Sequence, residues 1–212
     1  MKTLFITAKS KASITELIRN VQFEGKLGLL TTAQHLHLLP EAKNALKNSV
    51  IGGQVLGCDV SNALKIAKKV DAFIFIGSGN FHPVQVAMKT GKRVLILDPI
   101  AGNLSEVSSS DIETRKRKIT AGYAIFLNAN KIGILVSSKK GQSRMKEAEK
   151  LKKELEKQGK KAFIFVFDTL DFNQLENFPD IECWVNTACL RMAIEDYDKF
   201  PHSVVNISDL PL

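Results

Sequence analysis

Short apolar runs alternate with helix-like segments along the whole chain, and this alternation limits the fold more than any other feature. We predict strands at Leu4–Thr7, Leu27–Thr31, Ala72–Ile76, Val94–Leu97, Ile132–Val136, Ala162–Phe167, Cys183–Val185 and Val204–Ile207. Helix-like segments lie near residues 12–20, 40–48, 60–69, 83–90, 110–128, 142–158, 171–176 and 190–196. Uninterrupted aliphatic runs are typical of parallel strands that are covered on both faces. The sequence therefore predicts an α/β fold with parallel sheets flanked by helices.

Two segments resemble each other closely enough to indicate an internal repeat. Lys26-Leu27-Gly28-Leu29-Leu30-Thr31-Thr32 aligns with Lys131-Ile132-Gly133-Ile134-Leu135-Val136-Ser137-Ser138, and a glutamine and a helix-like segment follow each copy. Each half also has a cysteine after a small residue, although its distance from the aligned glycine differs. We expect two similar Rossmann-like domains, residues 1–125 and 126–212. Because ligands bind at the carboxyl ends of parallel strands, the polar segments after these strands should lie at that edge.

Composition excludes several classes of protein. The 212 residues are 44% hydrophobic and 25% charged, and no apolar run is long enough for a membrane span. We expect a cytoplasmic protein, because the N-terminus does not resemble a signal peptide and three cysteines do not suggest a disulfide framework. The net charge of +8 permits attraction to nucleic acid or to an acidic protein. No basic motif with interleaved aromatic residues is present, so we expect no direct contact with nucleic acid.

Two of the cysteines have the surroundings of reactive thiols. Cys58 and Cys189 each follow a small residue and precede a predicted helix. Small neighbours leave sulfur accessible, and a helix N-terminus favours the thiolate, which is the form that binds metal. Cys183 instead lies within a predicted strand, where a buried cysteine behaves as a small apolar residue.

Three polar segments follow predicted strands. Gly77-Ser78-Gly79-Asn80-Phe81-His82-Pro83 suits either a ligand site or a tight turn before a helix. Ser137-Ser138-Lys139-Lys140-Gly141-Gln142-Ser143-Arg144 lacks the pattern of a phosphate-binding loop, but it suits a carboxylate or phosphate group, or a solvated helix cap. Gln34-His35-Leu36-His37 places two imidazoles close together without further metal ligands nearby, and favours a loop or supporting role.

These motifs together resemble one known family. Gly53-Gln54-Val55-Leu56-Gly57-Cys58, Gly77-Ser78-Gly79 with Phe81-His82-Pro83, Lys139-Lys140-Gly141-Gln142 with Arg144, and Thr187-Ala188-Cys189 with Arg191 are similar to motifs of the diphthamide synthases. These are the archaeal and eukaryotic 2-(3-amino-3-carboxypropyl)histidine synthases. Family members have three similar α/β domains, and this chain resembles the second and third only. Met1 falls where the second domain would begin.

The resemblance implies a radical transferase. In the family, one cysteine from each domain binds a four-iron four-sulfur cluster, which cleaves S-adenosylmethionine. The resulting 3-amino-3-carboxypropyl group is transferred to a histidine of elongation factor 2. Carried over by motif, Cys58 and Cys189 would be cluster ligands, and His82 would line the pocket. The residues expected to hold S-adenosylmethionine, with the arginines and the glutamine on its carboxylate, are Gly77, Ser78, Gly79, Lys140, Gly141, Gln142, Arg144 and Arg191.

The chain departs from the family because no third cysteine matches a motif. A second chain could carry the missing domain, a homodimer could share its thiols, or the two cysteines could serve another purpose. We expect a component of a split or partial diphthamide synthase that acts with another chain. The alternative is a non-catalytic binding or assembly subunit of such a complex. A nucleotide-binding α/β protein unrelated to diphthamide would instead bind phosphate near Lys139–Arg144.

Overall fold

The computed structural model describes residue 4, residue 6 and residues 8–211. It divides into two compact units, Met1–Glu113 and Thr114–Leu212, and the division falls within helix α4 (Ser109–Asn128). The boundary expected near residue 125 lies further along this helix. Half of the strand predicted over Leu4–Thr7 lies outside the described residues, and the two residues that are described, Leu4 and Ile6, belong to no strand.

The first unit contains a sheet of five strands. Their order is β2-β1-β3-β4-β5, and all neighbours are parallel except β4 and β5. The strands are β1 (Leu27–Thr31), β2 (Ser49–Gln54), β3 (Ala72–Ile76), β4 (Val94–Asp98) and β5 (Asn103–Glu106). The helices are α1 (Leu39–Ala45), α2 (Ser61–Ile66) and α3 (Phe81–Thr90), with 3-10 helices at Leu17–Asn20, Ala33–Leu38 and Ala67–Lys69.

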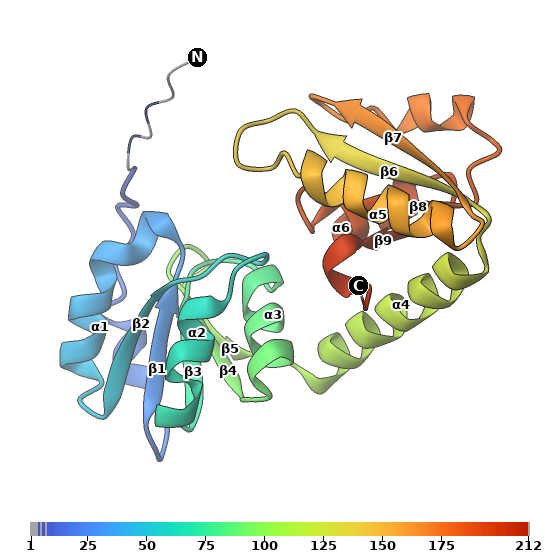
Figure 1. Cartoon of the computed structure of the whole chain (residues 1–212). Coiled ribbons are helices and arrows are strands. Elements are labelled where there is room, and N and C mark those ends of the chain that lie inside the picture. Colours follow the sequence, from blue (N-terminus) through green and yellow to red (C-terminus); the bar gives the residue numbers. More distant parts are fainter. Residues whose placement is uncertain (1–3, 5, 7, 212) are drawn as a thin grey trace. The chain divides into compact units, whose positions relative to one another are not determined.

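Both faces of this sheet are buried, as the aliphatic runs predicted. Leu29 and Ile74 point to the face that packs against α1, whereas Phe73 and Phe75 point to the face covered by α2 and α3 (Figure 1). Every residue of β1 and β3 is buried, and because side chains alternate between faces along a strand, their large apolar side chains divide between the two core clusters. The loops that follow the parallel strands lie at the carboxyl edge of the sheet, which the buried faces leave open.

The second unit has a sheet of four parallel strands in the order β7-β6-β8-β9. The strands are β6 (Lys131–Ser137), β7 (Lys161–Phe167), β8 (Cys183–Asn186) and β9 (Val204–Asn206). The helices are α5 (Met145–Lys157) and α6 (Met192–Glu195), with 3-10 helices at Phe172–Asn177, Tyr197–Lys199 and Ile207–Asp209. Residues of α5 and of the C-terminal part of α4 pack on one face, and those of α6 and the 3-10 helix Phe172–Asn177 pack on the other.

The internal repeat is visible in the strand order, because β2-β1-β3-β4 and β7-β6-β8-β9 follow the same scheme. The two aligned glycines, Gly28 and Gly133, also play the same packing role in the two sheets. A Cβ atom on Gly28 would lie 2.5 Å from the ring of Phe73, and one on Gly133 would lie 2.4 Å from the ring of Trp184. In each unit the central strand lacks a side chain where an aromatic ring of its neighbour crosses it. The predicted α/β class, with parallel sheets flanked by helices, is confirmed.

Some predicted elements differ from the structure. Strands β2 and β5 were not predicted, because Gly52 and Gly53 weaken the strand pattern of β2 and all of β5 is exposed. Strand β5 also runs antiparallel to β4. The helix predicted near 12–20 forms only the 3-10 turn Leu17–Asn20, and the helix near 171–176 is 3-10 as well. No helix among the described residues is both long and apolar enough to cross a membrane.

Candidate functional site

Cys58 lies in a tight loop between β2 and α2. The loop is closed by two backbone hydrogen bonds, from Leu56 N to Asp59 O at 2.8 Å and from Asp59 N to Leu56 O at 3.1 Å. Gly57 is buried against Phe81 of α3, so closely that a Cβ atom would fall 1.9 Å from the ring. Any larger residue before Cys58 would displace α3 or the loop. Cys58 itself remains exposed, as predicted from its small neighbour.

The loop Gly77–Asn80 joins β3 to α3 at the same edge of the first sheet. Ser78 Oγ donates a hydrogen bond of 2.6 Å to Asp98 Oδ1, and the amides of Ile100 and Ala101 donate to the same oxygen at 2.9 Å. Burial by itself would raise the pKa of the Asp98 carboxyl, but these hydrogen bonds hold the pKa below its ordinary value. The Asp98 carboxylate therefore anchors the loop in its charged form.

His82 is in the first turn of α3 and is half-buried. Its ring lies 5.9 Å from the ring of Phe75 and 5.2 Å from that of Phe81, measured between centroids. Because Phe81 also contacts Gly57, the Cys58 loop and the start of α3 form one cluster. Cys58, the loop Gly77–Asn80 and His82 thus share the carboxyl edge of the first sheet.

His35 is also near this edge, and its burial was not anticipated. It is fully buried in the 3-10 helix after β1, and neither ring nitrogen has a hydrogen-bond partner among the described residues. Desolvation lowers the pKa of His35, neighbouring His37 lowers it further, and Asp98 acts in the opposite direction. His37 is exposed, so the two imidazoles are not held together as metal ligands.

Cys189 lies in the loop between β8 and α6 of the second unit and is half-buried. The loop begins at Thr187, whose amide and hydroxyl both donate to the carbonyl of Leu135 in β6, at 3.1 and 2.8 Å. Cys189 O accepts a hydrogen bond from Met192 N at 3.1 Å, which starts α6. Two buried asparagines, Asn186 and Asn206, also contact this loop. The sequence motifs did not predict a role for either residue.

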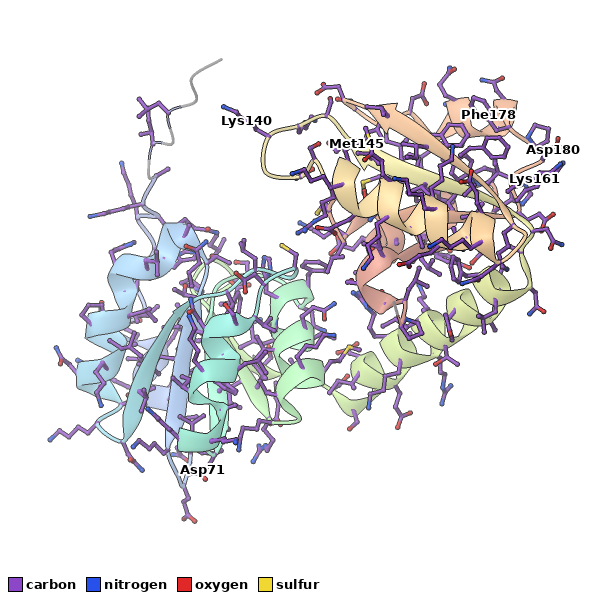
Figure 2. All side chains as sticks on the ribbon, in the orientation of Figure 1. Asp71, Lys140, Met145, Lys161, Phe178 and Asp180 are labelled. Carbon is purple, nitrogen blue, oxygen red and sulfur yellow. The ribbon has the colours of Figure 1, made fainter. Side chains whose placement is uncertain are left out.

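The second polar loop, Ser138–Arg144, follows β6 and is exposed throughout. Its Lys140 points away from the unit (Figure 2). The loop is tied to the end of β7 by Ser138 N, which donates to Phe167 O at 2.8 Å, and it turns through a hydrogen bond of 3.0 Å from Gln142 N to Lys139 O. Strands β6 and β8 are adjacent and parallel, so their following loops share the carboxyl edge of the second sheet.

Both candidate arginines have an acidic neighbour one helical turn away. Arg144 lies 2.8 Å from Glu147 in an exposed ion pair, and Arg191 pairs with Glu195. The pKa of Arg191 is raised, first by its hydrogen bond to Glu195. Exposed ion pairs of this kind contribute about 0–1 kcal/mol, so an anionic ligand can replace the glutamate at little cost.

Cys183 is confirmed as part of the core. It is fully buried within β8, and burial raises the pKa of its thiol to about 12. A neutral buried thiol is a poor metal ligand. Among residues 4, 6 and 8–211, no group of three or more histidine, cysteine, aspartate or glutamate side chains is placed to hold a metal ion.

The helices after the two cysteines are shorter than the motif argument assumed. α2 spans Ser61–Ile66 and α6 spans Met192–Glu195. A helix dipole sums over aligned peptide units, so such short helices contribute little to stabilising a thiolate. The cysteines also occupy different places in the repeat: Cys58 follows β2, whose counterpart is β7, whereas Cys189 follows β8, whose counterpart is β3.

Comparison with known proteins gives a consistent result. Residues 1–212 match a family model described as "Putative diphthamide synthesis protein". The 2-(3-amino-3-carboxypropyl)histidine synthase of Pyrococcus horikoshii is 36% identical, in an alignment covering 99% of this chain and 65% of that protein. The synthase of Methanocaldococcus jannaschii is 29% identical, over 93% of this chain and 57% of that protein. The chain therefore spans only part of the length of these relatives.

Two crystal structures are also similar. Dph2 from Pyrococcus horikoshii superposes with a TM-score of 0.83 at 33% identity, covering 95% of this chain and 62% of the other. A second structure of Dph2 from the same organism, with a 4Fe-4S cluster, gives a TM-score of 0.75 at 36% identity and covers 87% of this chain and 55% of the other.

Proposed function

Because the chain belongs to the diphthamide synthesis family, we propose that it is a component of a diphthamide synthase. In this proposal the complex transfers the 3-amino-3-carboxypropyl group of S-adenosylmethionine to a histidine of elongation factor 2 by iron–sulfur radical chemistry. The observation that carries the proposal is the pair of accessible thiols, Cys58 and Cys189, each in a loop at the carboxyl edge of its own sheet. The relatives' names and the Dph2 structure with a 4Fe-4S cluster support it.

The donor atoms of this chain fit such a cluster in part. Thiolates are the usual ligands of iron–sulfur clusters, and Cys58 and Cys189 are both accessible to solvent or nearly so. Clusters of this type need more than two cysteines, and the remaining cysteine, Cys183, is buried and protonated. We therefore propose that sequence outside this chain, on a second polypeptide, supplies the missing ligand. The relatives contain sequence that this chain does not match, and that sequence is the source we propose.

The polar loops would hold S-adenosylmethionine. A bound cluster would supply the electron that reductive cleavage of S-adenosylmethionine requires. Gln142, Arg144 and Arg191 carry the amide and guanidinium groups that suit its carboxylate, and they come from neighbouring loops of the second sheet. Lys140 and Gly141 belong to the same loop. Residues 77–79 and His82 would contact it from the edge of the first sheet.

Reconstitution of the cluster tests the proposal. The chain is incubated anaerobically with iron and sulfide, alone and together with the segment of the Pyrococcus horikoshii synthase that it does not match. We expect bound iron and the visible absorption of an iron–sulfur cluster in the mixture. Cys58→Ala and Cys189→Ala should abolish this absorption, whereas Cys183→Ala is the matched control and should retain it, because its thiol lies in the core.

A non-catalytic assembly subunit is the second candidate, and it is favoured by the burial of Cys183, which leaves two accessible thiols where a cluster of this type uses more. The same experiment separates the two. If no combination of chains binds iron, the synthase proposal is wrong. Binding of the chain to the added segment, unchanged by Cys58→Ser and Cys189→Ser, would then support the assembly role.

A further inference from the structure

We propose that Asn186 and Asn206 are positioning residues that hold the Cys189 loop, residues 187–191, in one conformation. Asn186 ends β8 and Asn206 ends β9, and the two are partners in the register of these strands. Their side chains are 0% and 2% exposed, and Asn186 Nδ2 donates to Asn206 Oδ1 at 2.8 Å. A buried amide pair is retained only where its hydrogen bonds are made, and it then stiffens its surroundings.

The pair reaches three successive residues of the loop. Asn186 Oδ1 accepts from Ala188 N at 3.0 Å, and Asn186 Nδ2 donates to Cys189 O at 2.8 Å. Asn206 Nδ2 donates to Leu190 O at 3.4 Å. The backbone is therefore held before, at and after the cysteine, so the direction of the Cys189 side chain depends on two amides buried beneath it.

Asn206 is itself supported from a second side. Its Nδ2 lies 3.3 Å from Asp209 Oδ2 in the 3-10 helix after β9. Arg115, which is 9% exposed, is electrostatically coupled to this carboxylate: burial lowers the pKa of Arg115, and the charges of Asp209 and Glu195 raise it. Arg115 and Asp209 also line one cavity with Asn206. A polar connection thus runs from α4 through β9 to the Cys189 loop.

The first unit contains the same arrangement with different chemistry. Asp98 ends β4, the counterpart of β9, and it accepts a hydrogen bond from Ser78 in the loop after β3, the counterpart of β8. In the first unit the last residue of β4 therefore holds the loop after β3, and in the second unit the last residue of β9 holds the loop after β8. This recurrence indicates that the contact is a shared feature of the repeated fold and is not specific to one loop.

A fixed loop has a consequence for chemistry. A thiolate presented in one direction loses little freedom when it binds a metal, and polar groups behind a ligand commonly set its geometry. The expected gain in metal binding rests on the proposed function. The immobilisation of the loop is independent of that function, and it is tested on the chain alone without iron or S-adenosylmethionine.

Hydrogen exchange of the unmodified chain gives the first test. The amides of Thr187 and Ala188 donate to Leu135 O and Asn186 Oδ1, so we expect both to exchange slowly. Amides of the exposed loop Ser138–Arg144 that make no such contact serve as the internal reference. If Ala188 exchanges as fast as the open loop, the proposal is wrong, and no variant is needed to show it.

Alkylation of the thiols gives the second test. In Asn186→Ala we expect iodoacetamide to modify Cys189 about tenfold faster, because two buried hydrogen bonds to the loop are lost. The rate at Cys58, measured in the same molecules by mass spectrometry, should not change. Asn206→Ala removes one direct hydrogen bond to the loop, that to Leu190 O, and the partner of Asn186 Nδ2, but it leaves both hydrogen bonds from Asn186 to the loop and should give a smaller increase.

Leu151→Ala is the matched control, because Leu151 is a buried residue of α5 that loses packing but does not belong to the loop or its anchors. A general loosening of the second unit would raise the Cys189 rate in this control as well. Equal rates in the control and the asparagine variants would overturn the proposal. A failure to bind iron, with the expected alkylation rates intact, would count against the proposed function and not against the loop.

Discussion

Cys183 lies inside β8 and Cys189 lies in the loop after the same strand, yet the two thiols differ in their exposure to solvent. Burial raises the pKa of Cys183 to about 12 and hides its sulfur, whereas Cys189 is half-buried and Cys58 exposed. His35 shows the same dependence on surroundings, since a residue type that is usually polar and accessible here has no exposed surface. At this scale, burial decides which side chains can react.

His35 should make the stability of the chain depend on pH. Its pKa is lowered in the folded state from an ordinary value of 6.5, so unfolding takes up a proton between the two values. The contribution of His35 to the free energy of unfolding is fully present above the unfolded pKa. It is lost as pH falls below that value, by up to about 1.4 kcal/mol per pH unit. Denaturant titrations should show this loss in the natural chain and not in His35→Phe. His202→Phe, which replaces an exposed histidine of the second unit, is the control, and an identical pH profile in all three chains would contradict the prediction.

At the scale of elements, strand ends organise the candidate site more than helices do. The short helices α2 and α6 offer little dipole, while Asp98, Asn186 and Asn206, each the last residue of a strand, hold the loops. The long helix α4 is likewise fixed by a side chain from elsewhere. Lys160 Nζ donates to Phe126 O, Leu127 O and Ala129 O at 3.3, 2.7 and 2.6 Å, and so satisfies carbonyls at the end of the helix.

Removal of this contact should weaken the second unit. We expect Lys160→Met to lower the free energy of unfolding by about 1–2 kcal/mol, because the variant keeps the apolar stem and leaves carbonyls at the end of α4 without their donor. Chemical denaturation followed by circular dichroism measures the change. Lys153→Met, which alters an exposed lysine of α5, should change the value by less than about 0.5 kcal/mol. Equal effects of the two substitutions would argue against a capping role for Lys160.

At the scale of the whole molecule, one topology occurs twice with cysteines in different places. The two units share the order of their parallel strands, but Cys58 follows an edge strand and Cys189 an inner strand. The repeat therefore explains the shared strand order but not the positions of the two cysteines. Any site that uses both cysteines is therefore a property of the chain and not of the repeating unit.

Mixing of variants tests whether one chain contributes both ligands. If Cys58 and Cys189 of the same chain bind one cluster, a mixture of Cys58→Ala and Cys189→Ala chains, with the added Pyrococcus horikoshii segment, should show no cluster absorption. If a homodimer shares its thiols between chains, the mixture should recover part of the absorption. We expect no recovery, and the unmodified chain at the same concentration provides the reference value.

The order of strands and helices and the α/β class could be predicted from the sequence, because hydrophobic periodicity reports local burial directly. The same is true of the loop positions of Cys189 and Gln142, since polar residues after an aliphatic run mark the end of a strand, whereas Cys58 follows β2, which was not predicted. Strands β2 and β5 were missed because exposed or glycine-containing strands lack that periodicity.

Only the tertiary structure decided which of these segments meet. The contacts of Gly57 with Phe81, of Asn186 with Asn206 and of Thr187 with Leu135 all join segments that are far apart in the chain. Such contacts depend on the order of strands in the sheet, which is set by packing between segments far apart in the chain. The sequence by itself therefore determined what each element is, and strand pairing determined which side chains support Cys189, because local pattern carries no record of a neighbouring strand.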